Sequence, residues 1–293
     1  MSDRTVTVRF FEVRNLTGDK TKFSECCKLA FQKPLANREV EVEPELAFRL
    51  ERFTPAAGSA PMRGQFVRMQ TQNLPHKAES GKELAELDVE SLGHSTAFQY
   101  IPSRRLLALQ MSHNGITPIR ISVYLEKLLS VKGWSILPIL TTNSARQLRE
   151  GNVRQLHVRV GSPQDLNATT PDEIAVMDAL KGMKNVGNMT YVAVTLGMGR
   201  AKTHMNSNFA SRIARWLVSE TKSNKAAKVR QVSATVRNAE TGHLELLRLL
   251  KAHLGNQGII KIPKKPIDAY ASIDAFITQA WKANEAELEK QYP

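Results

Sequence analysis

Cysteine, aromatic residues and long apolar runs are all scarce in this chain. The only two cysteines, Cys26 and Cys27, are adjacent, so a bridge between them would be strained, and four-ligand zinc spacing is absent. We therefore expect reduced thiols in a cytoplasmic protein. No run approaches the roughly 18 apolar residues that a spanning helix needs, and the polar N-terminus lacks the apolar segment of a secretion signal. These absences argue against secretion and against a membrane span.

The composition is nevertheless that of a protein with a substantial core. The chain has 293 residues, of which 42% are hydrophobic, and its mean hydropathy is −0.32. This length predicts one large or two medium domains.

Strand and helix patterns alternate along the first part of the chain. An opening strand ends near Arg14, and helical spacing follows over 22–33. The loop 54–61, which is rich in proline and glycine, separates the strands expected over 46–53 and 65–72 and predicts a hairpin with a long tip. Thr117 and Pro118 provide an N-cap and a first-turn proline for a helix. The acidic stretch 75–90 predicts a solvated helix or a loop. Further strands are expected over 46–53, 65–72, 95–101, 106–112, 134–140 and 153–160, and a short helix over 144–150.

The second part begins with the best-defined helix start in the chain. Thr170, Pro171 and Glu173 form the pattern of a capping box with a first-turn proline. A strand over 190–196 precedes an amphipathic helix over 206–221. Strands are also expected over 229–237 and 259–262 and a helix over 269–290, whereas 243–254 fits either a strand or a helix. We predict a mixed α+β fold, with an N-terminal sheet-and-helix domain at 1–165 and a basic C-terminal α/β domain at 166–293.

Positive charge is concentrated in one part of the chain. Residues 179–267 contain sixteen Lys and Arg but three Asp and Glu, and this excess equals the net charge of +13 of the whole chain. The first hundred residues are balanced, with fourteen basic and fourteen acidic side chains. Such a concentration favours binding of a polyanion, because counterions are released from its phosphates. Nucleic acid is therefore the first partner to consider, ahead of an anionic membrane surface.

The candidate nucleic-acid-binding residues span a loop, the 206–221 helix and the strand that follows. They are Arg200, Lys202, Arg212, Arg215, Lys222, Lys225, Lys228, Arg230 and Arg237. We expect Arg212 and Arg215 to point to solvent on the outer face of the helix. Phe209 and Trp216 are the only aromatic residues of 200–267, and both fall on its apolar stripe. Because no stacking platform for single strands is evident, double-stranded DNA gripped through its backbone is the favoured partner.

Signals for catalysis and cofactors are weak. The seven histidines form no His-x-x-x-His pair, and Glu220, Glu240 and Glu245 are too sparse for a two-metal site. Gly197-x-Gly199 after a strand lacks the rest of a dinucleotide or P-loop pattern. We expect no cofactor and no metal. A metal-dependent nuclease and a basic module that binds an acidic protein partner remain the alternatives to DNA binding without catalysis.

Two regions resemble the RexA-type phage-exclusion proteins. In the first, Ser91-Leu92-Gly93-His94-Ser95-Thr96-Ala97-Phe98-Gln99-Tyr100 and its partner 105–110 lead into Gly115-Ile116-Thr117-Pro118 and the helix through Leu129. The second runs from Val232-Ser233-Ala234-Thr235-Val236-Arg237-Asn238 through Glu240-Thr241-Gly242 and 258–263 to the final helix. The likeness covers about half the chain and is one of pattern and length.

The resemblance implies an α/β protein that binds DNA without sequence specificity, works as a homodimer and contributes to phage exclusion or anti-phage defence. It carries over no individual functional residue, because no shared motif fixes an alignment at the basic positions. The site residues given above therefore rest on charge alone.

Overall fold

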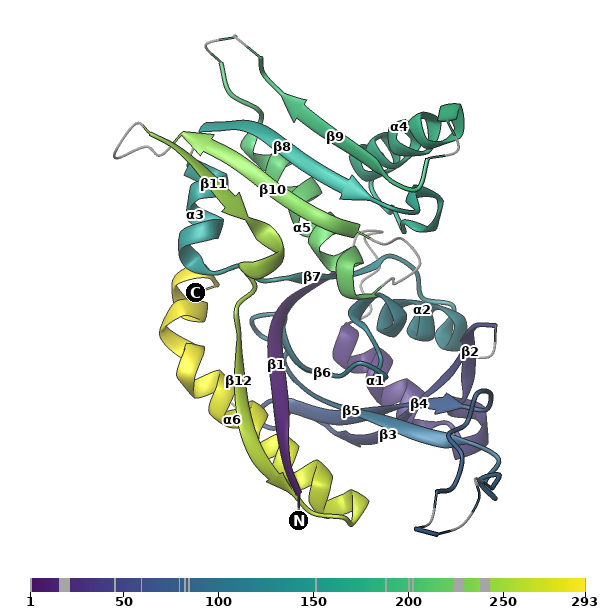
Figure 1. The fold of residues 1–293 in the computed structure, drawn as a ribbon. Helices are drawn as coiled ribbons and strands as arrows, with labels where there is room; N and C mark the ends of the chain where they lie inside the picture. The colour runs from purple at the N-terminus through teal and green to yellow at the C-terminus, as the bar shows by residue number, and fades with distance from the viewer. Residues whose placement is uncertain are drawn as a thin grey trace. The chain divides into compact units, whose positions relative to one another are not determined.

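The computed structural model has a mixed α+β fold, as the sequence predicts (Figure 1). It describes residues 2–15, 22–44, 46–58, 60–78, 80–81, 83, 85–150, 152–187, 189–199, 201, 203–223, 229–237 and 243–292. The chain divides into two compact units. Unit 1 comprises 1–8, 13–134 and 256–282, and unit 2 comprises 9–12, 135–255 and 283–293.

This division differs from the predicted domains at 1–165 and 166–293. Residues 135–165 belong to unit 2 because the strand β8 (Asn152–Val160) pairs with strands from later in the chain. Residues 256–282 belong to unit 1 because the strand β12 (Gly255–Ile262) joins the sheet of β1 (Ser2–Asn15). Both differences come from pairing between distant segments, which local periodicity does not encode.

Unit 1 is built on a large sheet in the order β12-β1-β6-β5-β4-β3-β2. The strand β7, whose residues from Ser135 onward belong to unit 2, also pairs with β1. The strands from β2 to β6 are antiparallel to their neighbours in this order wherever their register is given. The remaining strands of this sheet are β2 (Val40–Glu43), β3 (Leu46–Thr54), β4 (Met62–Gln70), β5 (Leu92–Ile101), β6 (Leu106–Met111) and β7 (Trp134–Pro138).

One face of this sheet packs on α1 (Phe23–Gln32) and α2 (Pro118–Leu129). Phe23 contacts Tyr100 of β5 with ring centroids 4.9 Å apart, and Tyr124 contacts Phe66 of β4 at 5.6 Å. The Tyr124 hydroxyl also accepts a hydrogen bond from the Leu50 backbone N–H at 3.1 Å. These aromatic contacts fill the space between the helices and the sheet.

The opposite face is covered by the first part of α6 (Pro266–Gln291). Gln99 of β5 is fully buried there and donates to Asp274 Oδ1 at 2.8 Å and to Thr278 Oγ1 at 2.9 Å. Arg63 of β4 forms an ion pair with Asp274 at 2.8 Å. Unit 1 therefore buries both faces of its sheet, and the N–H groups of Gln99 and Arg63 on the α6 face find partners on the helix.

Unit 2 contains an antiparallel sheet in the order β11-β10-β8-β9, and the helices described in this unit lie on one face of it (Figure 1). The other strands are β9 (Val192–Gly197), β10 (Val229–Arg237) and β11 (Leu244–Arg248). The helices α3 (Thr142–Glu150), α4 (Pro171–Gly187) and α5 (Ser207–Ser223) lie behind the sheet in Figure 1. Leu156, Val232 and Ala234 from the strands share a core with Ile213 and Leu217 of α5. Alternation thus directs every second side chain toward the helices, and it buries these side chains most completely in the central strands β8 and β10.

Most predicted elements form within a few residues of the expected bounds. The capping box at the start of α4 is confirmed, since the Glu173 carboxylate accepts hydrogen bonds from the backbone N–H groups of Thr169 and Thr170, while Thr170 Oγ1 accepts from the Glu173 N–H. The ambiguous 243–254 segment contains strand β11 followed by a short 3-10 turn. The described part of 75–90 contains no helix, which favours the loop alternative.

Cys26 and Cys27 are buried and unbridged, as expected. Among the described residues, no helix is both long and apolar enough to cross a membrane.

Candidate nucleic-acid interface

The uncovered face of the unit 2 sheet is the most distinctive surface of that unit. Register places four rows of side chains across it, running from β11 to β9. Side chains on this face belong to Leu244, Arg237 and Asn152; to Leu246, Thr235, Gln155 and Gly197; to Arg248, Ser233, His157 and Thr195; and to Gln231, Arg159 and Ala193. We call these residues the open face. No described helix of unit 2 packs on it, since α3, α4 and α5 contact the other side.

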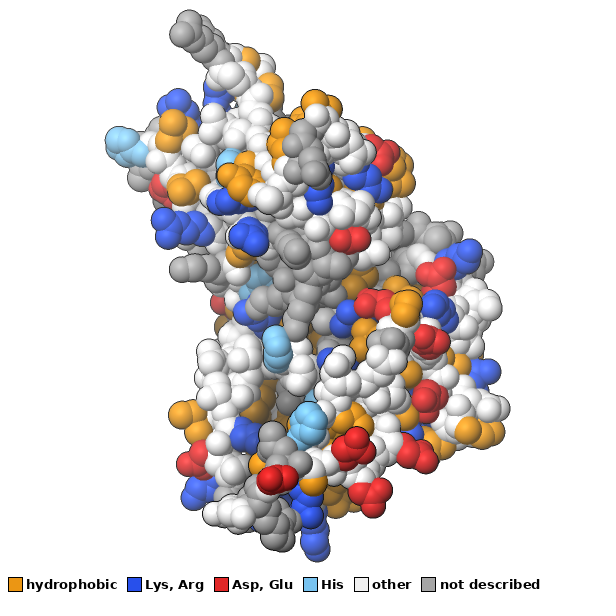
Figure 2. All heavy atoms as spheres, turned by 45° about the vertical axis from the view of Figure 1, so that its right-hand side comes forward, with side chains coloured by type: hydrophobic (Ala, Val, Ile, Leu, Met, Phe, Trp, Pro, Cys, Tyr) orange, Lys and Arg blue, Asp and Glu red, His pale blue; other side chains and the backbone are white. Residues whose placement is uncertain are grey.

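The open face is cationic. It carries Arg159, Arg237 and Arg248, and none of its residues is Asp or Glu. The four strands contain a single acidic residue, Glu245, which lies on the helix side, where Gln147 of α3 donates to its carboxylate at 2.6 Å. The alternation of β11 therefore separates the one carboxylate from the arginines. Figure 2 shows the Lys and Arg side chains on the part of the molecule that carries β8 to β11.

Arg159 of the open face is positioned by a neighbouring aromatic ring. Its guanidinium stacks over the ring of Tyr191, 3.8 Å from the ring centroid. The buried Nε of Arg159 has no hydrogen-bond partner among the described residues. Stacking holds the guanidinium plane by a cation–π contact, and a guanidinium held in this way has the fork geometry that suits an anion. A phosphate oxygen is the kind of acceptor that such a fork favours.

Neutral polar groups and two exposed leucines, Leu244 and Leu246, complete the surface between the arginines. His157 Nδ1 and Thr195 Oγ1 are hydrogen-bonded across β8 and β9 at 2.9 Å. Gln155 and Gln231 are exposed, so their amides can bond to phosphate or sugar oxygens.

Arg154 of β8 anchors the loop that follows β9. Its guanidinium donates to the Gly199 carbonyl oxygen at 3.0 Å and also to the carbonyl oxygen of Thr203. The same arginine side chain thus binds both ends of this loop. Arg200 and Lys202, two of the predicted binding residues, lie in the loop but outside the described residues, as do Lys225 and Lys228.

Two of the predicted residues lie on β10. Arg237 is on the open face, and Arg230 is exposed at the β-bulge between Val229 and Gln231. These two positions agree with a cationic sheet surface. Lys222 falls in the last turn of α5, with its side chain outside the described part of the chain.

The expectation that Arg215 points to solvent is wrong. Its side chain is 18% exposed and forms an ion pair at 3.0 Å with Glu12, whose side chain is 4% exposed. Arg215 Nε also donates to the Pro138 carbonyl oxygen at 3.2 Å, and Tyr292 donates its hydroxyl proton to Glu12. Arg215 therefore neutralises a buried carboxylate and is unavailable to phosphate.

Arg212 is half-exposed but engaged. It forms an ion pair with Asp172 in the first turn of α4, and the two side chains are 42% and 41% exposed. The expected outward cationic face of α5 is therefore partly neutralised in its described portion. Local spacing identified the buried stripe of α5 correctly, but it could not identify acidic partners supplied by other segments.

Sequence reasoning missed Arg159 and Arg248. Arg159 lies outside the 179–267 region where charge is concentrated, and Arg248 lies in the segment whose strand or helix character was left open. The available signal was the alternation of 152–160, which separates Gln155, His157 and Arg159 from the apolar positions.

A groove of about 730 Å³ lies at the β9 edge of the same sheet. Its lining residues come from α4 and from the approach to β9: Met183, Val186, Met189, Thr190, Tyr191, Val192 and Ala193. Figure 2 shows hydrophobic side chains gathered over α4 and the adjoining strand. The groove borders the open face, because Ala193 is the register partner of Arg159.

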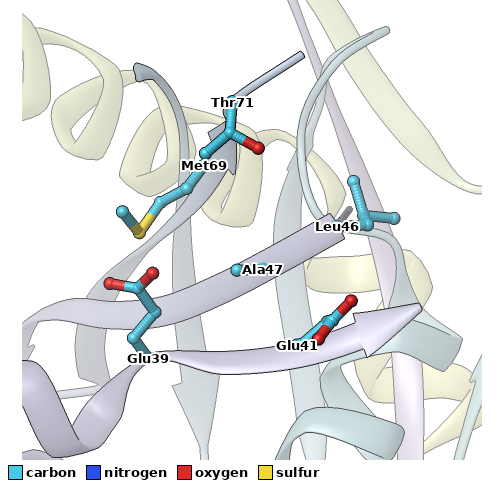
Figure 3. A pocket seen from close by; sticks show the side chains of 6 residues that line it. All are labelled: Glu39, Glu41, Leu46, Ala47, Met69 and Thr71. Atoms are coloured by element: carbon cyan, nitrogen blue, oxygen red, sulfur yellow. The ribbon is translucent and has the colours of Figure 1, made fainter. Parts of the chain in front are cut away.

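Unit 1 has a separate pocket of about 380 Å³ with a different chemistry (Figure 3). Glu39 and Glu41 line it together with Leu46, Ala47, Met69 and Thr71. In Figure 3 the Glu39 carboxylate points toward Met69. Two carboxylates beside an apolar wall are unsuited to phosphate. Within the described ranges, no group of three or more His, Cys, Asp or Glu is placed to hold a metal ion.

Comparison with protein families gives a match between residues 1–291 and a family of unknown function (DUF6731). Comparison with curated proteins gave no match.

Proposed function

The chain belongs to this family of unknown function, and we propose that it binds double-stranded DNA without sequence specificity, through the phosphate backbone. The observation that carries the proposal is the open face, with three arginines and no carboxylate. Neutralising phosphates releases condensed counterions, and this supplies most of the free energy of non-specific binding.

The side chains of the open face favour backbone contacts over base stacking. The face has no Phe, Tyr or Trp. Its one aromatic ring, the imidazole of His157, is hydrogen-bonded to Thr195, and the neighbouring Tyr191 is already stacked on Arg159. Proteins that hold single strands typically stack several bases on aromatic side chains. Arginine forks and exposed amides instead match phosphate and sugar oxygens of a duplex.

The biological setting that we propose is phage exclusion or anti-phage defence in the cytoplasm. It rests on the resemblance to RexA-type proteins, which also suggests a homodimer. Two copies would double the cationic surface, and non-specific affinity rises steeply with the number of phosphates contacted.

A salt titration tests the proposal. Binding of a random-sequence duplex is measured by fluorescence anisotropy at several salt concentrations, with a matched single strand as competitor and with or without Mg²⁺. Three arginine contacts predict a log–log slope of about −2.7 or steeper, since each neutralised phosphate contributes about −0.9. The duplex should also outcompete the single strand.

Other outcomes would point elsewhere. A slope near zero would refute backbone binding and favour an acidic protein partner. Cleavage of the duplex that requires Mg²⁺ would favour the nuclease alternative. Stronger binding of the single strand would refute the choice of duplex.

A further inference from the structure

We propose that the groove between α4 and β9 takes one unpaired nucleobase of DNA bound on the open face. The protein would then prefer duplexes with an overhang or an extrahelical base over blunt duplexes. This inference rests on the proposed function, because it assigns a second contact to the same ligand.

The walls of the groove suit a flat aromatic group. Met183, Met189 and Tyr191 are each between 41% and 46% exposed, and Val186 is 86% exposed. Large apolar side chains exposed side by side are typical of binding sites. Thioethers are polarizable and contact aromatic rings favourably, and bases stack on apolar and aromatic walls regardless of their identity.

Arg159 connects the groove to the open face. Its guanidinium lies on the Tyr191 ring, and Tyr191 lines the groove. A phosphate bound by Arg159 therefore lies next to the apolar walls. Phosphate and base are adjacent parts of one nucleotide, so the cationic edge and the apolar groove match the two halves of that ligand.

A paired base cannot occupy this groove while it remains stacked in the duplex. Extrusion from an intact duplex costs a few kcal/mol, and the cost is least for a base that is mismatched or already single-stranded. The groove should therefore discriminate between DNA ends and intact duplex, while the open face binds both.

A second copy of the chain is the other natural occupant, because β9 is an edge strand without charged residues. The charge beside the groove favours DNA instead. Arg159 lies at its border in a unit with no acidic residue on the open face, so two copies docked here would bring like charges together, whereas a phosphate complements them.

The experiment compares one labelled duplex in blunt form and with a three-nucleotide overhang. We expect about tenfold tighter binding of the overhang form, because stacking of one base contributes a factor of roughly five or more. The test variant is Met183→Ser/Val186→Ser, which changes exposed α4 residues of the groove. It should bind the blunt duplex normally and lose the preference. Ile174→Ser, on the same helix but outside the groove lining, is the matched control and should keep it.

The outcomes separate the two proposals. If the unmodified protein binds both duplexes equally, or if the variant keeps the preference, the base-binding groove is refuted and DNA binding stands. If neither duplex binds, DNA binding itself is refuted, and the base-binding groove is refuted with it. If light scattering shows a dimer that Met183→Ser/Val186→Ser converts to a monomer, the groove is a contact between copies and the inference is wrong.

Discussion

The two units treat their sheets differently. Unit 1 covers one face with α1 and α2 and the other with α6, whereas the described helices of unit 2 pack on one face of its sheet. Glutamine side chains show the consequence. Gln99 of unit 1 is buried and bonded to Asp274, while Gln155 and Gln231 of unit 2 are exposed on the open face. An antiparallel sheet tolerates solvent on one side, and in unit 2 that side carries the cations.

Arginine side chains also have two different roles in this protein. Arg63 and Arg215 are paired with carboxylates and support the folded state, whereas Arg159 is stacked on an aromatic ring and has a donor without a partner among the described residues. A count of charged residues along the sequence does not distinguish these arginines from one another. Only their partners distinguish a structural ion pair from a surface for an anionic ligand.

The largest expected effect is on the stability of unit 2. Arg215→Ala leaves the buried carboxylate of Glu12 without its cation, which should cost about 3–5 kcal/mol. Urea unfolding gives the loss. Hydrogen exchange should accelerate in 152–160 of unit 2 and not in 92–101 of unit 1. Arg212→Ala is the control, because its half-exposed ion pair should contribute about 1 kcal/mol or less. Equal losses in the two variants would contradict the distinction.

The second effect concerns the open face. Arg159→Glu/Arg248→Glu should weaken duplex binding by roughly 50-fold or more at 0.1 M salt, because two phosphate contacts are lost, and should reduce the salt slope by about 2. The matched control, Arg4→Glu/Lys282→Glu, makes the same change of charge at exposed positions of unit 1. Anisotropy titrations of both variants decide the matter. A similar loss in the control would mean that net charge, and not the open face, governs binding.

A third effect distinguishes the units by pH. Burial, helped by the nearby positive charge of Arg9, lowers the pKa of His253 in unit 2 to about 3. In the unfolded chain His253 takes up a proton near pH 6.5, whereas in the folded protein it stays neutral down to about pH 3. The contribution of neutral His253 to the free energy of unfolding is therefore complete above pH 6.5 and is lost as the pH falls toward 3. The loss should be about 1.4 kcal/mol per pH unit. The difference in unfolding free energy between the protein and His253→Gln should show this slope, and a flat difference between pH 6 and 4.5 would refute it.

The smallest effect tests the helical layer behind the open face. Thr170→Ala removes the side-chain acceptor for the Glu173 N–H at the start of α4, which should cost about 1 kcal/mol. Thermal unfolding measures this loss, and affinity for a blunt duplex should stay unchanged because the start of α4 lies outside both the open face and the groove lining. A large fall in affinity would show that the two faces of unit 2 are coupled.

Local patterns predicted the secondary structure of this protein well. Alternation identified β3, β4, β5 and β8, and the capping box identified the start of α4, because these signals arise from neighbouring residues. The candidate site was predicted less well. Arg237 lies on the open face, but Arg215 is bound by Glu12, which lies 203 positions away in the chain.

The sequence by itself determined the mixed α+β class, the absence of a bridge between the two cysteines, most element bounds and the local excess of positive charge. The tertiary structure decided which arginines remain available to a ligand, where the two units divide, and that one sheet keeps an uncovered face. The physical reason is the separation along the chain between the residues that interact. Periodicity and capping act over a few residues, whereas strand pairing and ion pairing bring together segments that are far apart along the chain.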